Sequence, residues 1–428
     1  PEAMMDLCHL SDAERQAWSR TVESMAAQGL RVLAVAQSRF TGNDWPETAH
    51  AFEFEWLGLI GLTDPLRAEI PQAMTECRSA GIRVIMITGD YPATAQVIAA
   101  QAGLPHGQTL TGDALDRLDD AALQAVLPHV SVCARISPHQ KLRIVQALQA
   151  HGEVVTMTGD GVNDAPALQA AHVGVAMGLR GTDVAREAAD LVLVDDNFAS
   201  IVRGIRVGRR IFGNLQKSMR YIFAIHIPIA GIALAPMVMN WPALMLPLHV
   251  ALLELVIDPA CSIAFENEPA DADVMQRPPR DTRAALFGAR DITLALVQGL
   301  LVLACVGLSY AWAKGWLNGG ATPALSEEET RSMVFVTLVL GYAALIVVNR
   351  AQPGQLWASL RVPNPSAWGV ILLAWGLVMA GMYWPWLAMT LKFAPLPNGP
   401  WTVALACGVL SLLAMSGLHW LHAQRQTR

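Results

Sequence analysis

The second half of the sequence consists mainly of long apolar stretches, and this feature limits the possible folds most strongly. Of the 428 residues, 53% are hydrophobic and only 15% are charged, whereas soluble domains carry about 25% charged residues. A membrane-spanning helix needs roughly 20 apolar residues. Six stretches reach or approach that length, near 220–239, 243–265, 290–313, 332–349, 367–387 and 400–421. We therefore expect residues 219–428 to form an all-α bundle of six transmembrane helices in a lipid bilayer.

The loops between these stretches predict how the bundle is oriented. Basic residues gather in the loops after the second and fourth stretches and in the tail, at Arg277, Arg280, Arg283, Arg290, Arg350, Arg361, Arg425 and Arg428. Positively charged loops stay in the cytoplasm, so we expect these loops, the C-terminus and the N-terminal half on the cytoplasmic side of a cell membrane. The acidic run Glu327–Glu329 falls on the opposite side and is expected to be a solvated loop. The compact loops are typical of a bacterial protein.

Residues 1–218 have the pattern of a soluble α/β protein. Short β-rich runs lie near 30–36, 57–62, 84–87, 130–134, 154–157, 173–176 and 191–194. Helical runs lie between most of them, near 11–28, 68–80, 93–102, 138–149 and 165–171. This alternation predicts an α/β domain with a doubly wound parallel sheet and crossover helices. A further helix from about residue 198, rich in arginine, is expected to form a cytoplasmic stalk.

Charge and cysteine content argue against several classes of protein. The net charge is −6 and no basic stripe is present, so nucleic acid is not an expected partner. The six cysteines form no CxxC pair, which argues against a zinc site and against a disulfide framework.

Two of the predicted strands end in the same tripeptide, Thr-Gly-Asp, at 88–90 and at 158–160. In open α/β sheets, ligands bind beyond the carboxyl ends of the strands. Asp160 and Asp164 offer carboxylate oxygens, which suit Mg²⁺. Lys141 lies between the two loops and offers a positive charge for a phosphoryl group. The hydrogen-bonding candidates around that group are Thr88, Gly89 and Asn163. One such tripeptide is an ordinary turn, but two copies with this continuation indicate a Mg²⁺-phosphate site.

These loops resemble those of the P-type cation-transporting ATPases, whose phosphorylation domain belongs to the haloacid-dehalogenase superfamily. The similar segments are MITGD at 86–90, MTGDGVNDAPAL at 157–168, DPLR at 64–67, CARISPHQKLRIV at 133–145, GLRVLAVA at 29–36, PE at 1–2 and RPPR at 277–280. The resemblance implies a remnant of the nucleotide-binding domain at 1–55, a haloacid-dehalogenase-like phosphorylation domain with its stalk at 56–218 and a transmembrane domain at 219–428. The TGDxxxTA form at 88–95 and the six helices favour the calcium/sodium–potassium-like class.

The resemblance also implies roles for individual residues. Asp160 would coordinate Mg²⁺, and Asp164 would support that site. Lys141 would contact the phosphoryl group of an aspartyl-phosphate, which Thr88, Gly89, Asp90 and Asn163 would position. Arg31 would lie near the phosphates of ATP, and Asp64 and Arg67 would lie at the hinge between domains.

The sequence departs from the family pattern in one important respect. The nucleophile of the family is the aspartate of a DKTGT motif, and no DKTGT occurs among the 428 residues. An aspartyl-phosphate needs that carboxylate, so we expect this chain to be inactive alone and to require the missing N-terminal portion of the same pump. Two alternatives stay open: a truncated or split-gene membrane protein without autonomous ATPase activity, and a phosphatase-type domain fused to a membrane anchor.

Ionisable residues inside the apolar stretches indicate an ion pathway, because such groups are expensive in a membrane. Glu254 and Asp258 are four residues apart and so share one helical face, while Pro259 would free backbone carbonyls nearby. His226 is a further candidate, and His249 is a weaker one. Calcium pumps resemble this pattern only at Asp258, so the transported cation is expected to be Ca²⁺, H⁺ or a monovalent cation.

Overall fold

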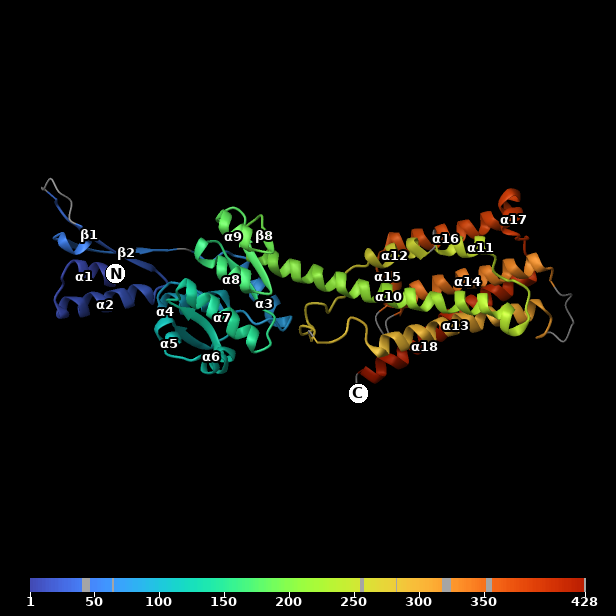
Figure 1. Ribbon diagram of the computed structural model, residues 1–428, viewed down its shortest axis with the longest axis horizontal. Helices are drawn as coiled ribbons and strands as arrows, with labels where there is room; N and C mark the ends of the chain where they lie inside the picture. Colours follow the sequence, from blue (N-terminus) through green and yellow to red (C-terminus); the bar gives the residue numbers. More distant parts are fainter. Residues whose placement is uncertain are drawn as a thin grey trace. The chain divides into compact units, whose positions relative to one another are not determined.

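The computed structural model describes residues 1–40, 47–63, 65–254, 258–281, 283–317, 325–351 and 356–426. The chain forms two compact units. The α/β unit consists of Pro1–Ile205 and Met275–Pro279, and the helical unit consists of Arg206–Val274 and Arg280–Arg428 (Figure 1). Helix α10 (Phe198–Met239) belongs to both units, because the boundary falls within it.

The α/β unit has three sheets within the described residues. The strands are β1 (Arg31–Gln37), β2 (Glu55–Leu62), β3 (Met86–Ile87), β4 (Gln108–Thr111), β5 (Val130–Ala134), β6 (Thr156–Gly159), β7 (Val173–Met177) and β8 (Leu191–Leu193). Strands β1 and β2 pair antiparallel, while β3-β5-β4 and β6-β7-β8 form two parallel sheets.

This arrangement differs from the single doubly wound sheet that the sequence predicts. The first two predicted strands pair with each other and join neither parallel sheet. The described part of their connection contains only a three-residue helical turn, η1 (Ala49–Ala51), whereas a parallel pair needs a longer crossover, usually a helix. Strand β4 was not predicted, because its sequence Gln-Thr-Leu-Thr is short and mostly polar.

The helices of the α/β unit are α1 (Glu2–Leu7), α2 (Asp12–Ala26), α3 (Ile70–Ser79), α4 (Pro92–Ala102), α5 (Gly112–Asp116), α6 (Asp120–Val126), α7 (Pro138–Ala150), α8 (Ala165–Ala170) and α9 (Asp183–Ala188), with short turns η2 (Leu127–His129) and η3 (Val162–Asp164). Of these, α1 and α2 pack against strand β1, whereas α4, α5, α8 and α9 pack against strands of the two parallel sheets. One apolar core contains Leu110 and Val130 from the first parallel sheet and Met157 and Ala176 from the second. The two sheets are therefore parts of one folded body.

The helical unit contains the apolar half of the sequence. After α10 its helices are α11 (Pro247–Leu252), α12 (Asp258–Glu266), α13 (Ala289–Ala313), α14 (Glu327–Arg350), α15 (Leu356–Arg361), α16 (Pro365–Tyr383), α17 (Pro385–Leu391) and α18 (Asn398–Gln426). Among the described residues, five helices are long and apolar enough to cross a membrane: α10, α13, α14, α16 and α18. The predicted second span instead contains the two short helices α11 and α12, and residues 255–257 between them lie outside the described residues.

The acidic run Glu327–Glu329 is the first turn of α14 and not a loop. Ser326 caps this helix, and its hydroxyl accepts a hydrogen bond from the backbone N–H of Glu329. Acidic side chains stabilise a helix N-terminus because they face its positive dipole end. Glu327 and Glu328 are exposed, as expected, whereas Glu329 is half-buried and accepts a hydrogen bond from the Ser326 backbone N–H.

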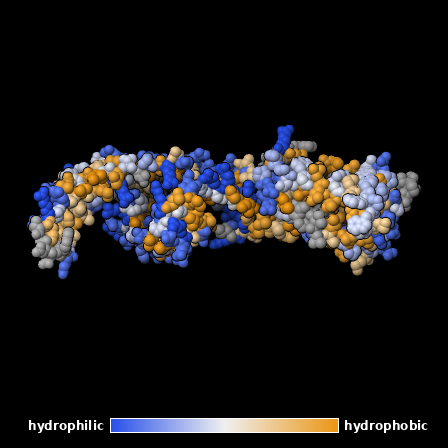
Figure 2. Space-filling view, turned by 90° about the horizontal axis from the view of Figure 1, so that it is seen from above, coloured by the Kyte–Doolittle hydropathy of each residue, from blue (hydrophilic) through white to orange (hydrophobic). Residues whose placement is uncertain are grey.

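The outer surface of the helical unit carries apolar side chains, some of which appear orange in Figure 2. Exposed examples are Leu234, Leu300, Leu372 and Leu413, which lie on four of the five long helices. A surface of this kind suits contact with lipid hydrocarbon and would be unfavourable in water.

Candidate functional site

The first Thr-Gly-Asp loop follows directly after strand β3. The Thr88 hydroxyl donates to Oδ2 of Asp90 at 3.0 Å and accepts from the Asp90 backbone N–H at 3.1 Å. These bonds fix the Asp90 carboxylate at the end of the strand. Gly89 is exposed, and an added Cβ there would meet no atom within 4 Å, so a ligand can approach its backbone closely.

The segment between β5 and α7 connects this loop to the second one. The backbone N–H groups of Arg135 and Ile136 donate to the carbonyl oxygens of Asp90 and Thr88, each at 3.1 Å. Helix α7 begins directly afterwards, with Ser137 as its cap. One turn later, Lys141 Nζ lies 2.6 Å from Oδ1 of Asp164 in the second loop. Residues 135–141 therefore bridge the two predicted phosphate loops.

The second loop is organised around the buried carboxylate of Asp164. Its Oδ2 accepts from the backbone N–H groups of Asp160 and Gly161, both at 3.3 Å. The Asp160 side chain is exposed, and its carboxylate has no hydrogen bond or ion pair to another described residue. Asn163 is also exposed, in the short turn η3. The structure thus separates the two carboxylates: Asp164 holds the loop and Lys141, while Asp160 remains available to a ligand.

Gly159 is required by this packing. A Cβ atom on Gly159 would lie 2.5 Å from Cβ of Asp164, closer than two carbon atoms can approach. We expect Gly159→Ala to displace Asp164 and to reduce local stability by about 1–3 kcal/mol, the usual range for overpacking. Hydrogen–deuterium exchange over residues 156–164 measures this effect. The matched control is Gly161→Ala in the same loop, where the nearest contact would be an ordinary 3.7 Å; equal exchange in the two variants would contradict the prediction.

Two arginines and an N-terminal residue surround the first loop. Arg31 Nε is 3.9 Å from Oδ1 of Asp90, so the residue expected near the phosphates of ATP lies beside the first loop. Arg135 stacks over the ring of Tyr91 at 4.8 Å and pairs with Glu2 at 3.2 Å. Burial and the hydrogen bond to Glu2 raise the pKa of Tyr91 to about 12, so its hydroxyl stays protonated.

The predicted hinge residues are only partly described. Asp64 lies outside the described residues. Arg67 donates through its guanidinium to the carbonyl oxygen of Asp196, which follows strand β8. Burial alone would raise the pKa of the Asp196 carboxyl, yet hydrogen bonds from the N–H groups of Leu179 and Arg180 lower it below its ordinary value. Arg67 is therefore held by a well-ordered turn, which is a suitable anchor for a hinge.

A third Thr-Gly-Asp, at 111–113, escaped the analysis of the sequence. It follows strand β4, and the Thr111 hydroxyl accepts from the backbone N–H of Ala114 as the cap of helix α5. Asp113 lies in the first turn of that helix and is exposed. This copy is an ordinary helix start, since no lysine or second carboxylate among the described residues bonds to Asp113, and it shows that the tripeptide alone does not define a site.

The residues of the second loop fit Mg²⁺ with help from a phosphate. Within the described residues, no group of three or more His, Cys, Asp or Glu side chains has the arrangement of a metal site. Mg²⁺ does not need one, because it is usually bound by one or two carboxylates together with waters and phosphate oxygens. The unpartnered carboxylate of Asp160 supplies such a ligand.

The membrane helices bring two of the three predicted ion-site residues together. His226 Nδ1 donates to the carbonyl oxygen of Ile222 at 2.7 Å, which leaves Nε2 facing Glu254 Oε1 at 3.9 Å. Glu254 lies in a π-helical turn, a deviation that is frequent at functional sites. Asp258 begins α12, and its side chain lies outside the described residues.

His249 has a structural role. It is fully buried, its Nδ1 accepts from the backbone N–H of Leu246 at 3.1 Å, and its Nε2 donates to the carbonyl oxygen of Leu391 at 2.7 Å. Its ring stacks on Phe393 at 4.6 Å. Both ring nitrogens are occupied, so His249 fixes α11 and is not available to a transported ion.

Both halves of the chain match families of known proteins. A family model described as haloacid dehalogenase-like hydrolase matches residues 12–172, and one described as cation transporting ATPase, C-terminus, matches residues 242–421. The "Calcium-transporting ATPase" of Bacillus subtilis is 34% identical over 410 residues, which cover 94% of this chain and 45% of that protein. The "Probable cation-transporting ATPase F" of Mycobacterium tuberculosis is 34% identical, with 97% of this chain and 47% of that protein covered. The chain belongs to the P-type cation-transporting ATPases.

Membership in this family explains why the chain combines a hydrolase fold with apolar helices. The hydrolase match includes the first loop, Lys141 and the second loop, while the C-terminal match includes Glu254 and Asp258. The chain spans less than half the length of the P-type ATPases described above. The human "Calcium-transporting ATPase type 2C member 1" is also 34% identical, over 71% of this chain and 32% of its own length.

Proposed function

We propose that this chain is the C-terminal portion of an ATP-driven cation pump that works through an aspartyl-phosphate intermediate. The observation that supports this most is the loop cluster, in which residues 135–141 bridge the two phosphate loops and Lys141 pairs with Asp164. His226 and Glu254, whose Nε2 and Oε1 atoms lie 3.9 Å apart in the apolar helices, contribute ligands to the cation site. The relatives' printed names favour Ca²⁺ as the transported ion, whereas the titratable histidine and carboxylate also suit H⁺ or a monovalent cation.

Two strand edges suggest where the missing nucleophile enters. In the described residues β3 pairs only with β5, and β6 pairs only with β7, so each parallel sheet ends in an open edge. The loops that follow these two edge strands are the two predicted phosphate loops. Open edges accept a further strand. A parallel strand from outside this chain, paired with β3 and β6, would end beside both loops and deliver its aspartate to Lys141.

The residues of the site then divide the work of phosphoryl transfer. The incoming aspartate attacks the γ-phosphorus of ATP, the bond to the bridging oxygen breaks, and ADP leaves. Mg²⁺ at Asp160, when bound, would neutralise charge on the phosphoryl oxygens. Lys141 supplies a fixed positive charge, and the Gly89 N–H and the Asn163 amide donate to the equatorial oxygens. The Thr88 hydroxyl can donate there as well once it turns away from the Asp90 carboxylate, to which it donates in this structure. Asp164 keeps Lys141 and the loop backbone in place.

The proposed location follows from the charge distribution. The α/β unit and the C-terminus lie in the cytoplasm, which requires an even number of crossings. The five long apolar helices cross the cell membrane, and the segment with the short helices α11 and α12 makes one further crossing between α10 and α13. The partners are the transported cation, the bilayer and the N-terminal portion of the same pump.

A complementation experiment tests the proposal. The chain is co-expressed with the part of the Bacillus subtilis relative that lies outside the aligned region, or fused to it as one polypeptide. We expect a hydroxylamine-sensitive phosphoenzyme from radiolabelled ATP in the completed protein and none from the chain alone. A correctly inserted fusion that forms no phosphoenzyme would favour the alternative, a membrane protein without ATPase activity.

A further inference from the structure

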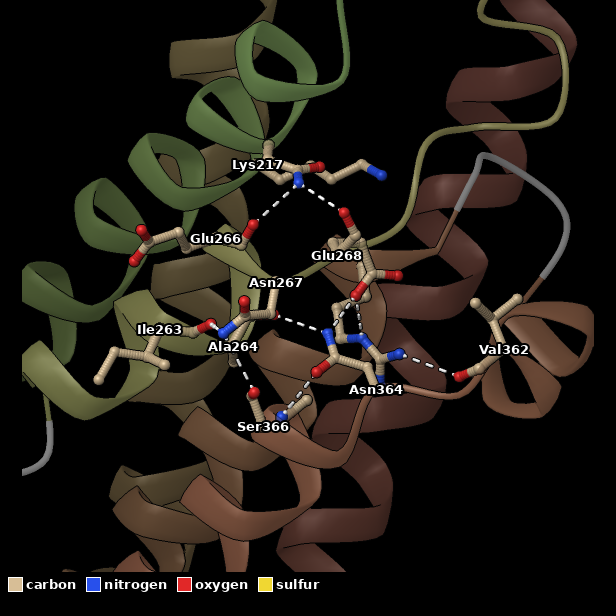
Figure 3. A network of polar contacts seen from close by, with 12 residues as sticks. Lys217, Ile263, Ala264, Glu266, Asn267, Glu268, Val362, Asn364 and Ser366 are labelled. Atoms are coloured by element: carbon tan, nitrogen blue, oxygen red, sulfur yellow. Dashed lines mark hydrogen bonds and ion pairs between the residues drawn. The ribbon is translucent and has the colours of Figure 1, made fainter. Parts of the chain in front are cut away.

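The helical unit contains a buried ion pair that none of the sequence motifs predicts. Arg350 Nε at the end of α14 lies 2.7 Å from Oε2 of Glu268, which follows α12. Both residues are less than 5% exposed. Asn364 donates to the same carboxylate oxygen at 2.6 Å, and Figure 3 shows Glu268 and Asn364 pointing toward each other. We refer to Glu268, Arg350 and Asn364 as the polar cluster.

The polar cluster connects four helices. Asn364 also donates to the carbonyl oxygen of Ala264 in α12 at 2.8 Å, and its Oδ1 caps α16 by accepting from the Ala367 N–H. Asn214 of α10 donates to the backbone carbonyl of Glu268 at 2.7 Å. Through these bonds α10, α12, α14 and α16 meet at one point.

Net stabilisation is a poor explanation for this cluster. Removing two charges from water is expensive, and replacing a buried ion pair by apolar residues is often neutral or stabilising. A directional network instead permits only one arrangement of the helices, since any shift leaves a buried charge unpaired. The Glu268 carboxylate is already engaged by Arg350 and Asn364, so a role as an ion ligand is not indicated.

Two of the connected helices carry the candidate ion residues. Glu268 is ten residues from Asp258, and Asn214 is twelve residues from His226, which corresponds to roughly 15–18 Å along a helix. Fixing α10 and α12 at the polar cluster therefore limits how they slide or rotate at the ion site.

We propose that Glu268, Arg350 and Asn364 are positioning residues. They hold the end of α12 against α14 and α16, and with it the Glu268 backbone carbonyl to which Asn214 of α10 donates, so that the cation ligands keep their spacing. This inference rests on the proposed function, because it assigns a role within the same ion site.

Cation-dependent phosphorylation of the completed pump tests the inference. The double variant Glu268→Leu/Arg350→Met removes both charges and avoids an unpaired buried ion, and Asn364 keeps its bond to Ala264. We expect it to fold, but to need an about 2- to 30-fold higher cation concentration for half-maximal phosphorylation, the range typical of residues that act through others. Phosphorylation by inorganic phosphate, which reports on the α/β unit, is expected to be unchanged.

Controls separate the possible outcomes. Arg361→Gln neutralises an exposed arginine near the same loop and is expected to leave the cation dependence unchanged. Arg350→Lys keeps the positive charge beside Glu268, and this variant is expected to retain most of the cation affinity of the parent pump. A folded double variant with unchanged cation dependence would overturn the inference while leaving the proposed function intact.

A second measurement does not depend on ATP chemistry. Cysteines introduced by His226→Cys and Glu254→Cys are compared for their disulfide formation rate with and without the double substitution. We expect the rate to change several-fold when the polar cluster is removed, and an unchanged rate would also refute the positioning role. If the parent pump forms no cation-dependent phosphoenzyme, the proposed function fails and this rate alone decides the inference.

Discussion

Asp160→Asn is expected to reduce phosphoenzyme formation at least about a thousandfold in the completed pump, because charge stabilisation by a bound metal contributes several kcal/mol. The asparagine preserves the shape of the side chain but removes the charge that attracts Mg²⁺. We expect Asp160 rather than Asp164 to be the metal ligand, because the Asp160 carboxylate has no other described partner while Asp164 is engaged by Lys141. Radiolabelled phosphoenzyme at saturating ATP and varied Mg²⁺ measures the loss.

Asp113→Asn is the matched control for that experiment. Asp113 belongs to the third Thr-Gly-Asp, is exposed and lies in the first turn of α5. Like Asp90 and Asp160 it is preceded by Thr-Gly, but it has no lysine partner among the described residues. We expect its variant to keep normal phosphorylation and membrane insertion. Normal phosphorylation of Asp160→Asn would instead remove Asp160 from the Mg²⁺ site.

Local patterns were sufficient to predict that the Thr-Gly-Asp segments at 88–90 and 158–160 lie at the ends of strands. Thr88 and Asp90 follow β3, and Asp160 follows β6, because a run of β-rich residues ended by Gly and Asp is a strong strand-end signal. The third Thr-Gly-Asp, at 111–113, follows the short, mostly polar strand β4, which the sequence pattern does not predict. What distinguishes the copies is their tertiary surroundings, which a tripeptide does not encode.

The pairing of strands could not be predicted in the same way. The β1 and β2 sequences have the same apolar character as the other strands, but their partners depend on how the chain returns between them. The sequence also does not specify that β3 and β6 lie in separate sheets, because both strands have the pattern expected of neighbours in a single parallel sheet. Open edges become visible only in three dimensions.

Long-range polar contacts were the least predictable part of the candidate site. The Lys141–Asp164 bond joins residues 23 positions apart, and the Arg350–Glu268 bond joins residues 82 positions apart. The Arg350 side chain was expected only to mark a cytoplasmic loop. Its burial against Glu268 depends on how α12, α14 and α16 pack against one another. The apolar pattern of each single helix does not predict that packing.

Glu254→Gln combined with Asp258→Asn is expected to raise the cation concentration needed for half-maximal phosphorylation by ATP at least about a hundredfold. At the cation concentrations that saturate the parent pump, phosphorylation is then largely lost. Removing one charged ligand from a desolvated site costs about 1.5–3 kcal/mol, and two removals exceed a hundredfold when they add. His226 then loses the partner that faces its Nε2. Phosphorylation as a function of Ca²⁺ concentration, and separately of pH without Ca²⁺, measures the loss and identifies the transported ion.

Glu266→Gln provides the control, because Glu266 is an exposed carboxylate at the end of the same helix α12. A change of Ca²⁺ dependence in the double variant but not in Glu266→Gln would support a specific Ca²⁺ site. A change confined to the pH series would favour H⁺ as the transported ion. Unchanged behaviour in both series would remove Glu254 and Asp258 from the ion pathway, and the contact between His226 and Glu254 would then have no role in transport.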